Sequence, residues 1–140
     1  MKPTLFLRIA SVLALIHAVL HTIGGVFSQP DPGPGAVAMQ AMIANQFPLF
    51  GHMRSYADFY RGMGLAVTIF LIFEALVFWQ LASLAKTDAS RLRPILGIFL
   101  VAYLALAVNS YIYFFIGPVI VETLIAFCLG MAIFTNVQRY

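Results

Sequence analysis

The sequence predicts an all-α fold, a bundle of four transmembrane helices with a short interfacial helix in the first outer loop. The chain of 140 residues is 62% hydrophobic and only 9% charged, with a mean hydropathy of +0.95. Soluble domains carry about 25% charged residues, so this composition indicates a membrane protein. Four apolar runs have the roughly 20 residues that a helix needs to cross a bilayer. They cover residues 5–27, 57–84, 94–115 and 118–136, and together predict a single membrane domain over 1–140.

The first run follows Lys2 and shares its basic start with a signal peptide. A signal-peptide core has about 7–15 apolar residues and ends at a small-residue cleavage site. This run continues to Phe27 without such a site, so we expect a retained helix. Of the later runs, the third has Pro94 in its first turn, a favourable position, and "GP" at 117–118 predicts a tight turn before the fourth.

The segment 28–56 is the first outer loop. It opens with "SQPDPGPG" at 28–35, which cannot continue a helix. The stretch "AVAMQAMIANQF" at 36–47 is apolar but too short to span a bilayer. We expect it to form an interfacial helix that Pro48 ends and that lies as a lid over the outer end of the bundle.

The basic residues predict the topology. With four spans, six basic residues fall on one side and only Arg54 and Arg61 on the other. The positive-inside rule then places both chain ends in the cytoplasm. The six are Lys2, Arg8, Lys86, Arg91, Arg93 and Arg139. Because the basic residues are scattered, they form no basic face and exclude nucleic-acid binding. The single cysteine, Cys128, excludes a disulfide framework and is expected to pack in the core.

Polar residues near the outer ends of all four helices predict a site. Counted inward at about 1.5 Å per residue, most of them lie within about 9 Å of the outer end, and His17 lies at about 15 Å. They are His17, His21, Asp58, Arg61, Asn109, Tyr113 and Glu122. Ionisable groups inside a membrane are functional candidates by default. We therefore expect a polar pocket open to the outer leaflet, with His21 facing the interior near Glu122 and Asn109.

Each candidate also has a purely structural interpretation. His17 and His21 share a helix face and can lock the bundle through hydrogen bonds to Asn109, Tyr113 or Glu122. Asp58 and Arg61 can form an interfacial ion pair. Glu74, deeper in its helix, is expected to be protonated or bonded to a neighbouring helix. Four further polar or aromatic residues of the outer segment are typical of an interfacial belt. They are His52, Tyr56, Phe59 and Tyr60.

Three functions fit this set. The first is binding of a small lipophilic or lipid-derived ligand, or relay of protons. The second is a membrane enzyme, with a metal on His17, His21 and Glu122 or an acid/base pair of Glu122 and Asp58. No HExxH motif is present, because Ala18 follows His17, and a haem would need His52 or a non-histidine ligand. The third is an accessory or scaffolding subunit of a larger membrane complex. The cofactor and the oligomeric state stay open.

Three segments carry a family resemblance: "HxxxHTxGG" at 17–25, "GHMRSYADFYRGMGL" at 51–65 and "WQLASLAK" at 79–86. Together they resemble a family of small bacterial four-helix membrane proteins with no established chemistry, similar in layout to DoxX-like proteins. The resemblance implies the bacterial inner membrane as the location. A looser architectural likeness to the sterol-isomerase and sigma-2-receptor superfamily implies a carboxylate that serves a cationic or sterol-like ligand, a part that Glu122 or Asp58 could take.

The topology can be tested directly. Reporter fusions at residues 35 and 88 should fall on opposite sides of the membrane, with residue 88 in the cytoplasm, because of the distribution of the basic residues. Paired cytoplasmic and periplasmic reporters at each position check the result. Both positions on the same side would contradict the four-span arrangement.

Overall fold

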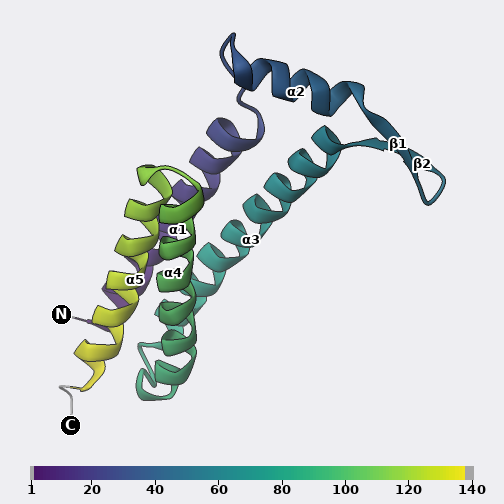
Figure 1. Ribbon diagram of the computed structural model, residues 1–140. Coiled ribbons are helices and arrows are strands. Elements are labelled where there is room, and N and C mark those ends of the chain that lie inside the picture. Colours follow the sequence, from purple (N-terminus) through teal and green to yellow (C-terminus); the bar gives the residue numbers. More distant parts are fainter. Residues whose placement is uncertain (1, 138–140) are drawn as a thin grey trace. The chain divides into compact units, whose positions relative to one another are not determined.

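The computed structural model describes residues 2–137 and confirms an all-α fold (Figure 1). Within residues 2–137, four segments are long and apolar enough to cross a membrane: Pro3–Val26, Tyr56–Leu84, Ser90–Tyr113 and Ile116–Thr135. The corresponding helices are α1 (Pro3–His21), extended by a π-helix (Thr22–Val26), α3 (Tyr56–Leu84), α4 (Arg93–Tyr113), preceded by a 3₁₀ turn (Ser90–Leu92), and α5 (Ile116–Val137). The predicted runs begin and end within a few residues of these bounds.

The chain forms two compact units. The first, here called the bundle unit, consists of Met1–His17 and Leu71–Tyr140 and contains most of α1, the second half of α3, and α4 and α5. The second, the hairpin unit, is Ala18–Phe70 and contains the end of α1, the π-helix, the outer loop and the first half of α3.

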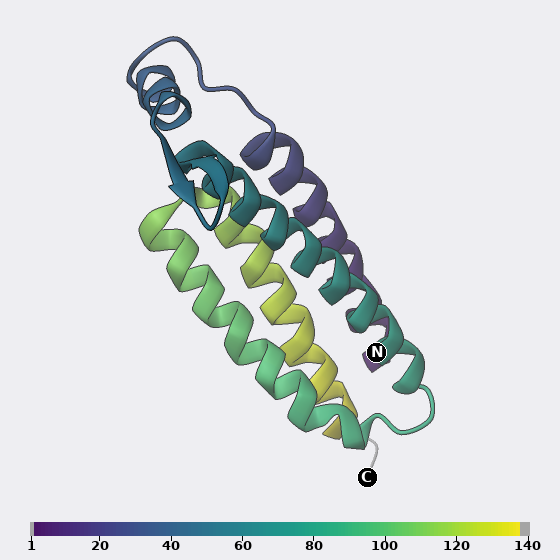
Figure 2. The same ribbon diagram turned by 90° about the vertical axis from the view of Figure 1, so that its right-hand side faces the viewer.

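Small residues let the four helices of the bundle unit pack closely. Ala10 and Ala14 of α1, Ala82 of α3 and Ala132 of α5 are fully buried in its core, as expected where backbones approach one another. Larger side chains fill the remaining space. They are Leu7, Phe78, Leu96, Tyr103, Ile125 and Leu129. Cys128 belongs to the same core, which confirms its expected packing role. Figure 2 shows α4 and α5 side by side along their length.

Basic residues lie at one end of the bundle unit. Lys2 and Lys86 line the same small depression, about 200 Å³ in volume, so the start of α1 and the connection after α3 lie at the same end. The Arg8 guanidinium lies 4.7 Å from the centre of the Trp79 ring, a cation–π contact. In the connection, a hydrogen bond from Ser90 lowers the pKa of Asp88. This shared end agrees with the predicted grouping of basic residues, of which Arg139 lies outside the described residues.

The outer loop contains the expected short helix, with different bounds. Helix α2 is Pro34–Ala44, so it begins two residues before the predicted stretch and ends three residues earlier. The expectation that Pro48 ends this helix is wrong. Residues Gln46–Leu49 form strand β1, which pairs antiparallel with β2 (His52–Ser55), and Pro48 lies opposite Met53. The placement of α2 over the bundle stays a prediction.

Two local features explain this hairpin. Its two turn residues, Phe50 and Gly51, both have positive φ angles, 46° and 83°, the conformation of a type I′ turn that suits the twist of paired strands. The ring of Phe47 in β1 packs against Tyr56 and Phe59 of α3, at centroid distances of 5.2 and 6.1 Å. Aromatic packing thus holds the extended backbone against the start of α3.

The core of the bundle unit can be tested at one position. Ala14→Leu should lower the free energy of unfolding by about 1–3 kcal/mol, because the larger side chain enters a filled core. The matched control is Val12→Leu on the same helix, since Val12 is 49% exposed whereas Ala14 is 0% exposed. Unfolding in detergent, followed by loss of helical circular dichroism, measures both. Equal effects of the two substitutions would contradict the observed packing.

Candidate functional site

The seven predicted site residues divide between the two units. His17, Asn109, Tyr113 and Glu122 belong to the bundle unit, and the other three, His21, Asp58 and Arg61, belong to the hairpin unit. The predicted approach of His21 to Glu122 therefore concerns residues of different units, and it stays a prediction. The contacts within each unit are described separately below.

Glu122 is a carboxyl group buried inside the bundle unit. Its side chain is 5% exposed and lies on α5, and the Ser110 hydroxyl of α4 donates a hydrogen bond of 3.0 Å to Oε1. The second oxygen, Oε2, has no hydrogen-bond partner among residues 2–137. Buried polar atoms are normally paired, and each exception calls for an explanation. Glu122 is therefore the strongest candidate for function in this unit.

A second acid, partly buried, lies in the same unit. Glu74 of α3 accepts a hydrogen bond of 2.7 Å from the hydroxyl of Tyr103 on α4, which confirms the expected bond to a neighbouring helix. Tyr103 is 0% exposed and packs against Phe78. Its hydroxyl is also within electrostatic range of Glu122. The bundle unit thus contains two carboxyl groups, one bonded to Tyr103 and the other within electrostatic range of it.

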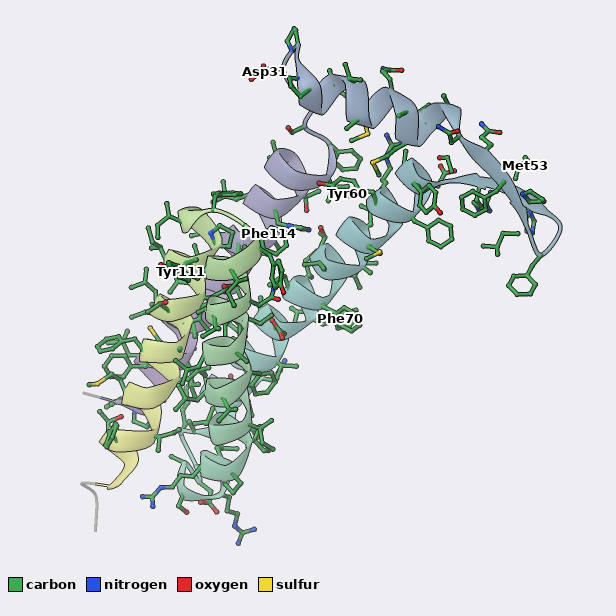
Figure 3. The ribbon with its side chains drawn as sticks, viewed as in Figure 1. Asp31, Met53, Tyr60, Phe70, Tyr111 and Phe114 are labelled. Carbon is green, nitrogen blue, oxygen red and sulfur yellow. The ribbon has the colours of Figure 1, made fainter. Side chains whose placement is uncertain are left out.

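The polar face of α4 differs from the prediction. Asn109 and Tyr113 are exposed, Tyr113 by 74%, whereas Ser110 is buried. The exposed side chains of this turn include Tyr111, labelled in Figure 3 with Phe114 just beyond the helix end. Each residue turns a helix by about 100°, so neighbours in sequence face different ways. Tyr103 and Ser110, seven residues or nearly two turns apart, share the buried face. The seven-residue spacing from Ser110 is the sequence signal that could have identified Tyr103 as a buried residue of the site.

Asp58 caps helix α3. Its Oδ2 accepts hydrogen bonds from the backbone N–H and the hydroxyl of Ser55, at 2.8 and 3.0 Å, and its own N–H donates to the Ser55 hydroxyl. This reciprocal pattern is a capping box. Among residues 2–137, Asp58 and Arg61 make no direct ion pair; Arg61 is exposed and lies only within electrostatic range of the carboxylate. A catalytic role for Asp58 therefore receives no support.

His21 joins two helices of the hairpin unit. Its Nε2 lies 3.0 Å from the carbonyl oxygen of Gly64 on α3. A carbonyl only accepts, so Nε2 carries the proton. In the next residue, the Thr22 hydroxyl lies 2.9 Å from the hydroxyl of Thr68, one turn beyond Gly64 on α3. His21 is thus tolerated in an apolar helix because it is bonded to a backbone carbonyl.

Glycines make these contacts possible. A Cβ atom on Gly25 would lie 3.3 Å from the His21 ring, and one on Gly64 would lie 2.9 Å from Val26. Gly64 therefore allows helix α3 and the π-helix Thr22–Val26 to approach closely, whereas Gly25 leaves room for the His21 ring on its own side. We call these contacts, made by His21, Thr22 and Val26 with Gly64 and Thr68, the histidine clasp. It accounts structurally for His21 and Thr22 of the HTxGG segment. His17 lies outside it, at a partly buried position on α1.

A metal site receives no support. Among residues 2–137, no three side chains of the metal-binding types His, Cys, Asp and Glu come together. The ligand set proposed from the sequence, which consists of His17, His21 and Glu122, therefore does not form such a group. His52, the alternative axial ligand for a haem, is exposed on strand β2.

Comparisons of the chain with protein-family models, with curated proteins and with solved structures found no match. The resemblance to DoxX-like proteins therefore stays a prediction.

The histidine clasp can be tested by comparing two glycines of α3. Gly64→Ala should lower the free energy of unfolding by about 1–3 kcal/mol, because its methyl group meets Val26. Gly62→Ala, two residues earlier, meets nothing within 4 Å and should be neutral or stabilise by up to about 1 kcal/mol. Unfolding in detergent measures both.

The double substitution Gly64→Ala, Val26→Ala is the second control. It should cost less than the sum of the two single changes, since removing the valine methyl groups makes room for the new one. Additive costs, or equal stability of the Gly62 and Gly64 variants, would show that close approach at Gly64 is unimportant.

Proposed function

We propose that the chain is a multi-pass protein of the bacterial inner membrane, with both ends cytoplasmic, whose bundle unit binds and relays protons through the carboxyl groups of Glu122 and Glu74. The observation that carries the proposal is the buried Glu122 oxygen without a hydrogen-bond partner. The four helices long and apolar enough to cross a membrane support the location in a bilayer.

The chemistry follows from the surroundings of Glu122. Burying an ionised carboxylate is costly unless it is paired, so a buried carboxyl group can take up one proton to become a neutral acid and release it to become a carboxylate. Ser110 donates to Oε1, which leaves Oε2 as the oxygen that gains the proton. If this position served packing alone, an unbonded carboxyl oxygen would not be needed there. A side chain with a hydroxyl or an amide could take the place of Glu122 with all its polar atoms bonded.

Tyr103 is the group that connects the two acids. A tyrosine hydroxyl both donates and accepts, so it can receive a proton from the side of Glu122 while its own proton passes to Glu74, the group it already bonds at 2.7 Å. An intervening water can bridge any remaining gap. Glu74 lies ten residues, or about 15 Å, from the end of α3. The two acids therefore extend the polar path from the outer third of the bundle to its middle.

Other functions from the sequence are less favoured. The metal-dependent enzyme lacks a ligand cluster in the described part of the chain. Asp58, the proposed partner of Glu122 in acid/base chemistry, is bonded within its own capping box. The filled core around Glu122, where Ile125 and Leu129 are fully buried, suits a proton better than a larger ligand at this position.

Proton flux into proteoliposomes tests the proposal. Vesicles with a trapped pH-sensitive dye and an imposed membrane potential should acidify with the wild-type chain. Glu122→Gln should reduce the rate at least about tenfold, since a barrier higher by about 1.4 kcal/mol already has this effect. The amide keeps the shape and can still accept from Ser110, but it cannot take up a proton. Tyr103→Phe should also slow the flux.

The matched control is Asp88→Asn, an acid outside the membrane-spanning helices that should leave the flux unchanged. Infrared difference spectra on a pH step give a second readout, in which the band of a protonating carboxyl group should disappear in Glu122→Gln. Wild-type vesicles no more permeable than empty ones, or full flux in Glu122→Gln, would rule out the relay.

A further inference from the structure

The hairpin unit contains an open groove that the proton relay does not use. Its volume is about 330 Å³, within the range of small-molecule sites. One side comes from the hairpin and the other from the first three turns of α3. The lining residues are Leu49, Arg54, Asp58, Phe59, Gly62, Met63 and Ala66.

The groove is apolar along its length and charged at one end. Gly62 and Ala66, four residues apart on one face of α3, form a floor without bulky side chains, and a Cβ on Gly62 would meet nothing within 4 Å. Leu49, Phe59 and Met63 add apolar walls. Arg54 precedes the helix and Asp58 lies in its first turn, and the two charges are within electrostatic range of each other.

Both charged groups can bind a further partner. One N–H of the Arg54 guanidinium donates to the carbonyl of Met53, and a guanidinium has five N–H donors. The Ser55 hydrogen bonds to Asp58 use Oδ2, which leaves Oδ1 as an acceptor. The groove lining therefore offers a cationic donor and an anionic acceptor.

The position along α3 indicates the source of the ligand. Helix α3 is long and apolar enough to cross a membrane and begins at Tyr56. Its first turns therefore lie at the depth of the lipid headgroups. The labelled side chains Tyr60 and Phe70 follow this helix inward (Figure 3), and both are exposed, as expected of residues that face lipid.

We propose that this groove binds phosphatidylethanolamine from the membrane. The phosphate accepts hydrogen bonds from Arg54, the primary ammonium donates to Asp58, and one acyl chain lies over Gly62 and Ala66. A zwitterionic headgroup with N–H donors matches both charges. Phosphatidylcholine has no N–H to donate, and phosphatidylglycerol has no cation for Asp58.

Native mass spectrometry of the full, delipidated chain tests this proposal with three lipids of identical acyl chains. Phosphatidylethanolamine should bind about tenfold more tightly than phosphatidylcholine or phosphatidylglycerol, the scale of one charge-assisted hydrogen bond. Arg54→Gln should weaken its binding by a similar factor. The matched control is Arg91→Gln, which removes the same charge from an exposed residue of the bundle unit. Circular dichroism verifies that each variant is folded.

A second substitution tests the apolar half of the groove. Ala66→Leu fills the floor of the groove without changing its charge and without touching the helix cap at Asp58. It should weaken binding of the ethanolamine lipid. Equal binding of the three lipids, or no effect of Arg54→Gln, would overturn the proposal. Loss of a dimer in Ala66→Leu with lipid binding intact would identify a second copy of the chain as the occupant and overturn it as well.

Discussion

The structure depends on the cost of an unpaired polar group in apolar surroundings. The hydrocarbon of a bilayer offers no water, so polar side chains on the spanning helices need partners inside the protein. Each unit shows this. In the bundle unit, the Ser11 hydroxyl donates to the carbonyl of Ala75, and Tyr103 donates to Glu74. In the hairpin unit, His21 bonds to Gly64. Each of these bonds joins two helices, so the few polar residues specify which helix faces pair.

Small residues make these bonds reachable, because a side-chain hydrogen bond across helices requires the backbones to approach. Ser11 lies next to the buried Ala10 and its acceptor is the carbonyl of another alanine, Ala75. Gly64 both accepts from His21 and leaves room for Val26. Polar bonding and close packing are thus two aspects of the same contact at Gly64.

The sequence predicted the four long helices because their apolar runs are long and continuous, and bilayer thickness sets their length. It did not predict the hairpin, whose turn residues, Phe50 and Gly51, lack the Asn-Gly or Asp-Gly signature. It also did not predict which side chains of α4 are buried. A membrane helix is apolar on its lipid face as well as its packed face, so hydrophobicity does not distinguish Asn109 from Ser110. The partner of His21 was missed because a backbone carbonyl has no sequence signal.

Depth in the helix grouped His21 with Glu122, whereas the two residues have different hydrogen-bond partners. His21 has a carbonyl partner that defines its tautomer, and its place in the histidine clasp explains its presence without any ligand. Glu122 has one bonded oxygen and one that is not. Selection for packing alone favours a side chain whose polar atoms are all satisfied, since each unsatisfied buried atom costs about 1–3 kcal/mol. For this reason the proposed proton chemistry is assigned to the acid rather than to His21.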